Sequence, residues 1–488
     1  VYTSDRDATA FPLSAVKPFL IPVLGTRFVL SIKDAGTDKE RFKARLVVQG
    51  FKDPDKLYLL HNAPTVRVYN LRLLISIATA KGWSIIIGDV PQAYIKSDRL
   101  RRSLRIRLPA DLPPGIVGFV AGQIVLLLKP LYGLPDSGSY WFDKLQAAFR
   151  KWGLKPLTTD KCLLYKHDER NNPILLVATH VDDVIITGET SEIQKLRTQL
   201  EEEFKIKWSA KPLIYTGTTI NSDSTTRSMD QLSYVERVLH GESDFARFRG
   251  QLAWIASNTR PDLSYEAARM AQMNYERNPK ECDAVRKKVI KHLTETKTVS
   301  LKFPPVDLDN VQLAVYSDAS HKFDTDNAQC GYVILLVDTK KNCNVIHWSS
   351  ARPRRVTRST LSAELSAFSS ACDMASMMKA ELQVLVGHTV DLMSVTDSET
   401  LFNLITSTKI TTEKRLMFEV NAIREQFEQF DITNVAWVKS EYNIADPLTK
   451  LCQNTYLTQA MNGKLEHPVD QWLTTFIEHT DDPSPTQL

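Results

Sequence analysis

Residues 174–188, ILLVATHVDDVIITG, decide the fold, because two strongly apolar segments in them enclose a short acidic turn. Residues 174–179 and 184–187 are rich in β-branched side chains, so the pattern predicts a β-hairpin. Asp182 and Asp183 occupy its tip. Adjacent carboxylates beside buried strands are unfavourable unless something neutralises them, and a divalent cation does so. The alternative is that two turn residues cap the hairpin in solvent, since Asp is common in turns.

A third carboxylate and two cations lie upstream of this hairpin. Asp89 follows residues 84–87, which predict a short buried strand. Residues 27–49 predict a β-ribbon on which Lys43 and Arg45 alternate onto one face. That face is either a binding surface for an anion or simply solvated. Further predictions for this region are helices at 66–80, 141–152 and 191–204 and a strand at 124–128.

The rest of the chain changes from helical to mixed patterning. Residues 231–298 predict successive helices, at 231–239, 245–258, 261–278 and 282–296. After Pro304 and Pro305, strands and helices alternate, which indicates a separate α/β domain. The strands are predicted at 311–317, 331–337, 344–349, 392–396 and 433–439, and the helices at 360–381, 399–407 and 412–430.

Four acids in this last region stand where a sheet edge could collect them. Asp318 and Asp397 end predicted strands, Glu364 lies in a predicted helix, and Asp446 opens another. Strand ends and helix starts can converge on one edge of an α/β sheet, where crowded carboxylates again call for a divalent metal. Taken singly, each acid is better explained as a surface charge or a cap than as a ligand, so the evidence for a metal site is their shared placement.

Composition excludes several other classes of protein. Apolar residues make up 43% of the 488-residue chain and the formal net charge is +4, so neither general disorder nor a strongly basic protein is indicated. The six cysteines contain no C-x-x-C pair, which argues against a disulfide framework or a zinc ribbon and for a reducing compartment. No apolar run reaches bilayer length, so we expect a soluble protein without a membrane partner. The chain begins with Val1, which suggests a piece of a longer precursor.

Six sequence blocks, taken in order, resemble the reverse transcriptase of copia-type LTR retrotransposon polyproteins. The order and approximate spacing are more specific than any single block. The blocks are RFKARLVVQGF (41–51), TVRVYNLRLLISIATAKGW (65–83), GDVPQAYI (88–95), LKPLYGLPDSGSYWF (128–142), HVDDVIITG (180–188) and TRPDLSYEAARMAQ (259–272).

The resemblance implies a polymerase site that uses two Mg²⁺ or Mn²⁺ ions. Asp89, Asp182 and Asp183 would be the catalytic carboxylates, and the main-chain carbonyl of Val90 would be a further ligand. Tyr94 resembles the aromatic gate that favours dNTPs over NTPs, although a core aromatic is an equal alternative. The residues implied to meet or underlie the incoming nucleotide are Lys43, Arg45, Tyr132 and Gly133.

The C-terminal acids resemble those of a copia-type ribonuclease H. Gly331–Val333, HWSS (347–350) and ADPLTK (445–450) support this resemblance. It implies that two further metal ions cleave the RNA strand of an RNA/DNA hybrid. The implied ligands are Asp318, Glu364, Asp397 and Asp446. Arginines that could contact phosphates, or could equally belong to solvated or salt-bridged surfaces, are Arg99, Arg101, Arg102, Arg105 and Arg107 and, downstream, Arg352, Arg354, Arg355 and Arg358.

The chain also departs from the family pattern. His180 stands where the family has an aromatic residue before V-D-D, and LYGLPDSGSYW replaces LYGLKQAPRQW, which places Asp136 beside the expected nucleotide site. Both changes bear on nucleotide affinity. Ser362 replaces the first acid of the family's STEAEY, and VKSEYNIAD lacks a loop histidine found in related nucleases, which predicts slower turnover.

These patterns together predict an α+β reverse transcriptase right hand followed by an α/β ribonuclease H-like domain. The implied activity is an RNA-directed DNA polymerase with tethered ribonuclease H that copies retrotransposon RNA into cDNA, with RNA template, DNA primer, RNA/DNA hybrid and dNTPs as partners. The alternative is a catalytically retired nucleic-acid-binding scaffold. The resemblance implies an intracellular location, in a cytoplasmic particle and in the nucleus. The expected segments are fingers and palm at 1–235, a helical thumb or connection at 236–306, ribonuclease H at 307–452, and a C-terminal extension at 453–488 whose last residues are frayed.

Overall fold

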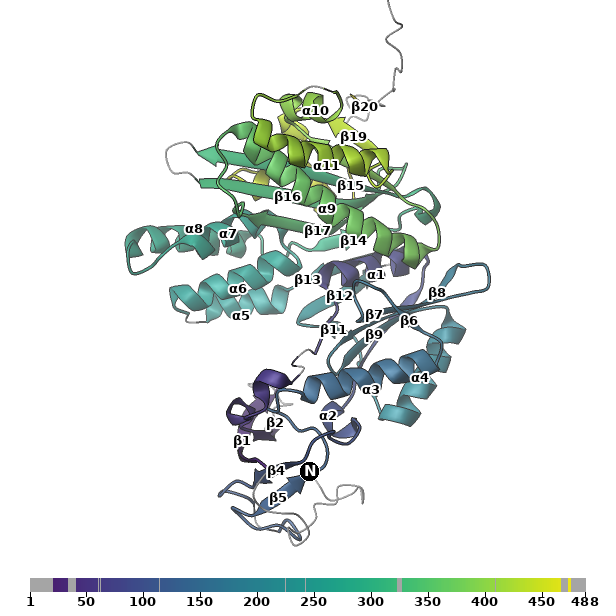
Figure 1. Ribbon diagram of the computed structural model, residues 1–488, viewed down its shortest axis with the longest axis vertical. Coiled ribbons are helices and arrows are strands. Elements are labelled where there is room, and N and C mark those ends of the chain that lie inside the picture. Colours follow the sequence, from purple (N-terminus) through teal and green to yellow (C-terminus); the bar gives the residue numbers. More distant parts are fainter. Residues whose placement is uncertain are drawn as a thin grey trace, which may run out of the picture.

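The computed structural model forms an elongated stack of sheets and helices (Figure 1). Its N-terminal sheets lie at one end of the long axis and its C-terminal sheet lies at the other. The described residues are 21–33, 41–59, 61, 63–113, 115–223, 225–241, 243–322, 327–408, 410–466 and 473–474. The ends expected to fray, including 481–488, lie outside this set.

A curved four-stranded sheet forms the end that carries the cationic ribbon. β1 and β2 form the predicted antiparallel ribbon, with Val29 opposite Arg45 and Ser31 opposite Lys43. β4, which was not predicted from the sequence, pairs parallel to β1 and antiparallel to β5, so the order is β2-β1-β4-β5. The strands are β1 (Val23–Lys33), β2 (Arg41–Val48), β4 (Leu104–Arg107) and β5 (Ile124–Leu127).

The central sheet contains the hairpin from which the sequence analysis started, and its order is β10-β3-β9-β8-β7-β6. Alternate residues of β8 point to opposite faces, as the two-residue period of a strand requires. Leu175 and Val177 pack in the core with α3 and α4, whereas Leu176 and Ala178 pack with α1. The elements are α1 (Val68–Ala80), β3 (Ser84–Asp89), α2 (Ala93–Lys96), α3 (Ser137–Lys151), β6 (Lys155–Pro156), β7 (Leu163–His167), β8 (Pro173–His180), β9 (Asp183–Gly188), α4 (Thr190–Phe204) and β10 (Lys207–Trp208).

A small sheet and a helical module follow. Short, polar strands between residues 213 and 230 form a sheet with a distant strand, in the order β11-β12-β13-β14, which the hydrophobic pattern does not predict. The helical module, residues 232–295, has its own apolar core. The elements are β11 (Leu213–Tyr215), β12 (Thr218–Asp223), β13 (Thr226–Asp230), α5 (Leu232–His240), α6 (Phe245–Asn258), α7 (Ser264–Gln272), α8 (Pro279–Glu295) and β14 (Leu301–Phe303).

The C-terminal unit, residues 312–461, is an α/β layer, as predicted. Its first three strands are antiparallel, β15 and β18 are parallel, and the sheet order is β17-β16-β15-β18-β19-β20. Helix α9 crosses this sheet, and α10 and α11 lie beside it (Figure 1). The elements are β15 (Gln312–Lys322), β16 (Asn327–Val337), β17 (Cys343–Ala351), α9 (Thr360–Val386), β18 (Asp391–Thr396), α10 (Glu399–Ile405), α11 (Met417–Glu428), β19 (Asn434–Trp437), α12 (Thr455–Met461) and β20 (Leu473–Thr474).

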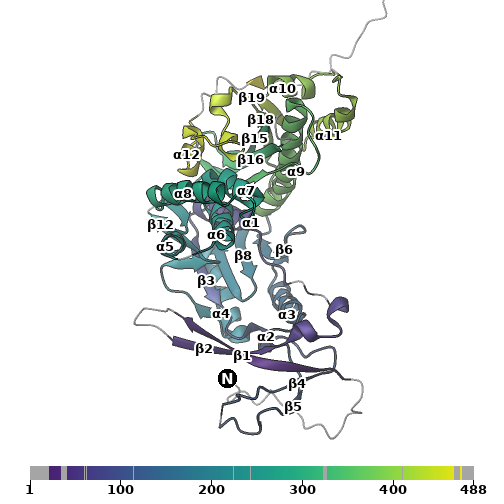
Figure 2. The same ribbon diagram turned by 90° about the vertical axis from the view of Figure 1, so that its left-hand side faces the viewer.

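The central sheet and the C-terminal unit share one apolar core. One cluster of buried side chains runs from the central sheet through α1 into β15, β16, β17 and α9. Figure 2, turned by 90°, shows the same stacking, with α1 between the two sheets. Two predicted helices are shorter than expected: 261–278 is helical only to Gln272, and 412–430 becomes an α-helix only at Met417. Within the described ranges, none of the helices combines the length and the apolar character needed to span a bilayer.

Candidate functional site

The hairpin brings the first three acids together. Asp89, the last residue of β3, lies opposite Asp183, the first residue of β9. The backbone N–H of Val90 donates to the carbonyl oxygen of Asp182 at 2.9 Å. The backbone therefore brings Asp89, Asp182 and Asp183, 94 positions apart at their extremes, to one edge of the central sheet.

The turn that carries Asp182 has a strained backbone. Val181 adopts φ +58°, a left-handed conformation that is unfavourable for a β-branched residue. The indole N–H of Trp141, on α3, donates to the Val181 carbonyl at 2.6 Å. Trp141 is 1% exposed and packs in the core, so this hydrogen bond from α3 fixes the conformation of the turn. The carboxylates are held on a rigid turn, which suits metal binding.

Electrostatics in this site match a cation-binding role. Burial raises the pKa of Asp182, and the neighbouring Asp89 adds to this shift. Lys43 and Arg45, reaching over from β2, act in the opposite direction and lower the pKa of Asp182. The site thus has paired acids on one wall and cations on the other, an arrangement that can hold a metal-bound triphosphate.

A cavity of about 1030 Å³ opens in front of the carboxylates. All three acids line it, as do Lys43 and Arg45. Four further polar residues that sequence reasoning did not single out also line it. Lys207 is the most informative, because β10 places it directly opposite Asp89 in the ladder. No spacing rule reveals such a cross-strand neighbour. The additional residues are Arg41, Gln92, Lys129 and Lys207.

Tyr132 and Tyr94 form a pair of packed aromatic rings at this site. Their ring centroids lie 4.7 Å apart, and the Arg45 guanidinium lies 6.0 Å from the Tyr132 ring. Tyr132 lines the cavity, whereas Tyr94, half-buried behind it, is not among the lining residues. Gly133 has φ +90°, and a Cβ there would come within 2.1 Å of the Val48 carbonyl oxygen. Glycine is therefore required where this loop crosses β2.

The structure gives Asp136, one of the two departures from the family pattern in the polymerase region, a different role from the expected one. Asp136 does not face the nucleotide cavity, contrary to the sequence-based expectation. It is 4% exposed, and its carboxylate accepts hydrogen bonds from Arg102, which also pairs with Asp53 and Asp55. Arg102 therefore belongs to a buried ion network, which favours the salt-bridge interpretation for this arginine.

His180 lies at the end of β8, opposite Asp183. Burial lowers the pKa of His180, and the nearby Asp182 only partly opposes this. At neutral pH the imidazole is therefore uncharged, and it adds no cation to the site.

The second set of acids also converges. Asp318 on β15, Asp397 just after β18, and Asp446 in the 3-10 turn Asp446–Leu448 place carboxylate oxygens within 4.8 Å of one another. Glu364, in the second turn of α9, lies close enough for its charge and that of Asp318 to affect each other. Close packing allows this convergence, because a Cβ on Gly331 would lie 2.7 Å from the Leu448 Cβ.

These four acids are crowded and incompletely satisfied. Burial, followed by the charge of Asp446, raises the pKa of Asp318 to about 7. Burial, followed by the charge of Asp318, raises the pKa of Glu364 to about 9. Glu364 Oε2 and Asp446 Oδ1 are buried without a hydrogen-bond partner. Hard oxygen donors with unpartnered atoms and mutual repulsion fit a divalent cation such as Mg²⁺ or Mn²⁺.

Three neighbours of these acids were missed in the sequence analysis. The Thr449 hydroxyl donates to Asp318 Oδ2, Asn443 Nδ2 donates to Asp397 Oδ1 at 3.0 Å, and Lys450 Nζ lies 2.8 Å from Asp446 Oδ2. All three flank Asp446 in sequence, so the segment NIADPLTK (443–450) contains the signal. Of the expected downstream arginines, Arg355 pairs with Glu419 at the surface, at 3.0 Å.

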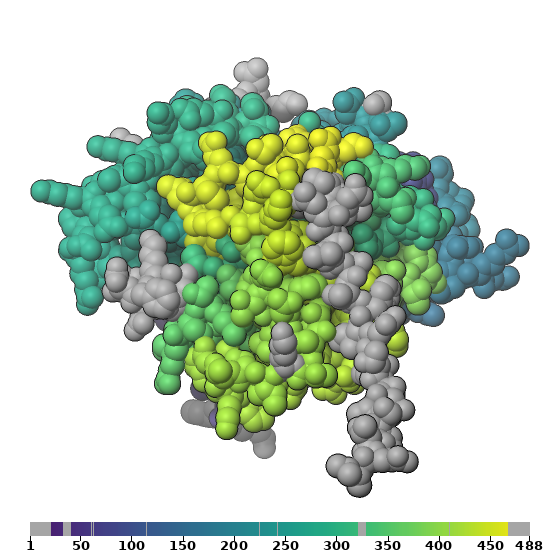
Figure 3. Space-filling view, turned by 90° about the horizontal axis from the view of Figure 1, so that it is seen from above, coloured from purple at the N-terminus to yellow at the C-terminus, as the bar shows by residue number. Residues whose placement is uncertain are grey.

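The helical module borders the second site. α7 packs against β17 and the turn that carries Asp446, and Gln272 Nε2 donates to Gln329 Oε1 at 3.2 Å. Figure 3 shows the late residues of the chain, in yellow, lying against the teal helices of this module. The second carboxylate site therefore lies beside the helices of this module.

Comparisons with known proteins give the chain a family context. Residues 16–246 match the family model described as "Reverse transcriptase (RNA-dependent DNA polymerase)". The "Retrovirus-related Pol polyprotein from transposon TNT 1-94" of Nicotiana tabacum is 25% identical over 478 residues, covering 88% of this chain. The "Transposon Ty1-DR1 Gag-Pol polyprotein" of Saccharomyces cerevisiae is 24% identical and also covers 88%. The chain spans only 34% and 26% of the lengths of these relatives.

Solved structures give weaker matches. A structure of LC11-RNase H1 in complex with an RNA/DNA hybrid matches 28% of this chain and 93% of its own, at 20% identity and a TM-score of 0.23. The foamy viral protease-reverse transcriptase in complex with double-stranded DNA matches 88% and 67%, at 12% identity and a TM-score of 0.22. TM-scores this low carry no argument about the fold. The sequence relatives alone confirm the expected resemblance to retrotransposon polyproteins of the copia kind.

Proposed function

Because residues 16–246 belong to the reverse transcriptase family and the relatives are retrotransposon Pol polyproteins, we propose that this chain is an RNA-directed DNA polymerase with a tethered ribonuclease H. It would extend a DNA primer on an RNA template with dNTPs and degrade the RNA strand of the hybrid. The observation that carries the proposal is the convergence of seven sequence-distant acids into two separate carboxylate sites. In this proposal the curved sheet and central sheet act as fingers and palm, and the helical module acts as the thumb.

In the polymerase reaction, this chain's own groups position the reactants. Lys43 and Arg45 neutralise the triphosphate from above, while the Tyr132 ring supports the nucleotide from below. Tyr94 does not line the cavity, so it would act on the sugar only through Tyr132, against which its ring packs at 4.7 Å, and would in this way favour a deoxyribose. Asp89, Asp182, Asp183 and the Val90 carbonyl would hold two Mg²⁺ or Mn²⁺ ions. When bound, these ions activate the primer hydroxyl and stabilise the departing pyrophosphate.

In the nuclease reaction, a second set of acids would hold two more ions, which activate water and stabilise the leaving oxygen. Thr449 and Asn443 orient Asp318 and Asp397 by hydrogen bonds, and such outer partners fix the ligand geometry. Lys450 neutralises Asp446 and would be displaced toward the cleaved phosphate. The ligands in this proposal are Asp318, Glu364, Asp397 and Asp446.

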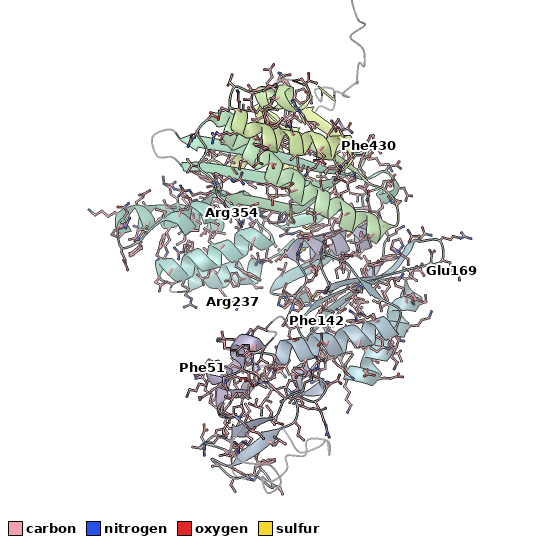
Figure 4. The ribbon with its side chains drawn as sticks, in the orientation of Figure 1. Phe51, Phe142, Glu169, Arg237, Arg354 and Phe430 are labelled. Carbon is pink, nitrogen blue, oxygen red and sulfur yellow. The ribbon has the colours of Figure 1, made fainter. Side chains whose placement is uncertain are left out.

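Exposed residues elsewhere are consistent with a nucleic-acid partner. Figure 4 shows Arg237 at the lower edge of α5 and Phe51 on the 3-10 turn after β2, with Arg354 in the loop after β17. Phe51 is 70% exposed. Cations and exposed aromatic rings are the groups that bind phosphates and unpaired bases.

The deciding experiment is primer extension on an end-labelled RNA template with dNTPs and Mg²⁺, following both strands in one tube. Asp182→Asn is expected to reduce synthesis by more than about 100-fold, since even an outer partner of a metal ligand can cost that much, and to leave RNA cleavage intact. Asp397→Asn is the matched control and is expected to do the reverse. If the unmutated chain binds hybrid but neither extends nor cuts it, with Mg²⁺ or Mn²⁺, the chain is a nucleic-acid-binding scaffold instead.

A further inference from the structure

Helix α1 has no solvent-facing side. Residues 69–79 are all buried, and these positions include Arg72 at 1% exposure. A helix buried on all sides belongs to the interior of a larger structure rather than to the surface of one domain. Here one face of α1 packs on the central sheet, and the other packs on β17 and on α9 of the C-terminal unit.

Arg72 makes directional contacts with all three parts of the molecule. It extends from α1 and donates to the Ile346 carbonyl in β17 at 2.8 Å. It also donates to the carbonyls of Ser257 and Asn258, at 2.6 and 2.7 Å, where α6 of the helical module ends. The last carbonyls of a helix have no partner within the helix, so a cation is well placed there.

Trp348 completes the same junction from the C-terminal unit. Its ring lies 3.8 Å from the Arg72 guanidinium carbon, and its indole N–H donates to the Ala256 carbonyl at 2.9 Å. Three successive carbonyls at the end of α6 are therefore bound by side chains from two other units. In the described part of the chain, none of the ion pairs involves Arg72, whose guanidinium instead contacts backbone carbonyls and the indole ring.

Burying a cation without a counter-ion costs desolvation free energy, so it is an unfavourable way to stabilise a contact between surfaces. Apolar residues of similar volume often stabilise such a site equally well or better. What the guanidinium adds is direction, because its planar donors fix the angle and spacing of the groups that accept from it. The chemistry of Arg72 therefore points to positioning rather than to stability alone.

We propose that Arg72 is a positioning residue. It holds the polymerase unit (the curved and central sheets), the helical module and the nuclease unit (the C-terminal unit) in one rigid arrangement, and this fixes the distance between the two carboxylate sites. The inference rests on the proposed function for its consequence: RNA is cut at a constant distance behind the primer end. It also means that the helical module does not swing independently of the sheet that carries Asp89 and Asp182.

The first test maps RNA cuts relative to the primer end on an end-labelled hybrid. The unmutated chain is expected to give one narrow cluster of cut positions. Arg72→Met is expected to broaden that cluster at least about two-fold while single-nucleotide incorporation stays within about three-fold, and Arg72→Lys is expected to restore part of the sharpness. Leu145→Ala is the control, because Leu145, on α3, is also buried (2% exposed) but belongs to a different apolar cluster, away from the junction. An equally narrow cluster in Arg72→Met would overturn the proposal.

The second test needs no activity and so separates this inference from the proposed function. Spin labels at cysteines introduced for Glu202 on α4 and Glu428 on α11, both exposed, report the distance between the two units, with Cys452→Ser removing the exposed natural thiol. The expected result is one narrow distance distribution in the parent chain and a broad one in Arg72→Met. Identical narrow distributions would refute the lock even if the chain proves inactive.

Discussion

At the scale of single residues, the structure separates two kinds of buried charge. Asp182 in the first candidate site and Asp318, Glu364 and Asp446 in the second have raised pKa values, and two oxygens of the second site have no hydrogen-bond partner, which is typical of groups that bind a cation. Asp136 and Arg102 instead satisfy each other.

Asp136→Ala tests the reassignment of this residue. We expect a loss of about 1–3 kcal/mol in unfolding free energy, because Arg102 keeps Asp53 but loses two hydrogen bonds to a buried carboxylate. The dNTP KM should not change, since Asp136 does not line the cavity. Denaturant unfolding and steady-state incorporation measure the two quantities. Asp55→Ala, at a carboxylate 50% exposed, is the control and should cost less than about 1 kcal/mol. A raised KM in Asp136→Ala would restore the nucleotide-site interpretation.

His347 predicts acid sensitivity of the junction around α1. Its ring packs between Tyr69 and Tyr332, and burial, with a smaller contribution from Arg72, lowers its pKa to about 3. The unfolded chain binds this proton near pH 6.5, so the contribution of His347 is present above that pH and is lost as pH falls toward 3. The slope reaches at most ~1.4 kcal/mol per pH unit.

We expect His347→Phe to flatten the loss of unfolding free energy between pH 6.5 and 5, the range in which most carboxylates remain ionised. Urea unfolding of both proteins at several pH values measures the difference. His167→Phe provides a histidine control outside the junction. If parent and His347→Phe curves run parallel across this range, the imidazole does not titrate as described.

At the scale of secondary-structure elements, the sequence pattern predicted the elements correctly where one face of the segment is buried or where the segment is rich in β-branched residues. The ribbon β1–β2, the hairpin β8–β9, helix α9 and the alternation of the C-terminal unit follow the predictions. Strands β11–β13 do not, because they are short and polar and gain their partner, β14, from about 70 residues away. The predicted helix at 261–278 ends early, at Gln272, and Pro279 starts α8. Because the residue before a proline disfavours helical backbone, the two helices cannot run together through Asn278.

The candidate sites were predictable in their acids but not in their surroundings. Asp89, Asp183 and Asp397 stand at or just after strand ends, where hydrophobic runs stop. Asp318, predicted to end a strand, instead lies within β15, while Glu364 lies in α9 and Asp446 in a 3-10 turn. Lys207 and Thr449 could not be assigned, because cross-strand register and turn packing bring them to Asp89 and Asp318.

The end of α9 carries a contact between elements that can be tested with matched glycines. Gly387 ends the helix at φ +85°, and a Cβ there would lie 2.0 Å from the Asn171 carbonyl oxygen in the β7–β8 turn. Asn171 Nδ2 also donates to the Gly387 carbonyl at 2.9 Å. Gly82 follows α1 at φ +64° with nothing within 4 Å of its Cβ position.

Gly387→Ala is therefore expected to cost more than Gly82→Ala. Both pay about 1–2 kcal/mol for a left-handed alanine, and Gly387→Ala adds about 1–3 kcal/mol for the overlap with backbone. Chemical denaturation of the two variants measures the gap. Equal losses would mean that the β7–β8 turn yields freely and does not hold α9.

At the scale of the whole molecule, the shared core predicts that the central sheet and the C-terminal unit unfold together. Leu176 in β8 and Leu336 in β16 are fully buried in the same cluster. We expect Leu176→Ala and Leu336→Ala, each costing about 2–5 kcal/mol, to lower the temperature of one common calorimetric transition. Two transitions, each moved by only one variant, would show that the units are thermodynamically separate.

The all-round burial of α1 also has a consequence for the order of synthesis. Arg72 binds the carbonyl of a residue that lies 274 positions later in the chain. At a translation rate of roughly 5–20 residues per second, that partner emerges roughly 14 to 55 s after Arg72. Throughout that interval the outward face of α1 has no surface to cover it. The nascent chain therefore carries an exposed apolar helix throughout this interval, and its yield should depend on chaperones that shield this helix until β17 arrives.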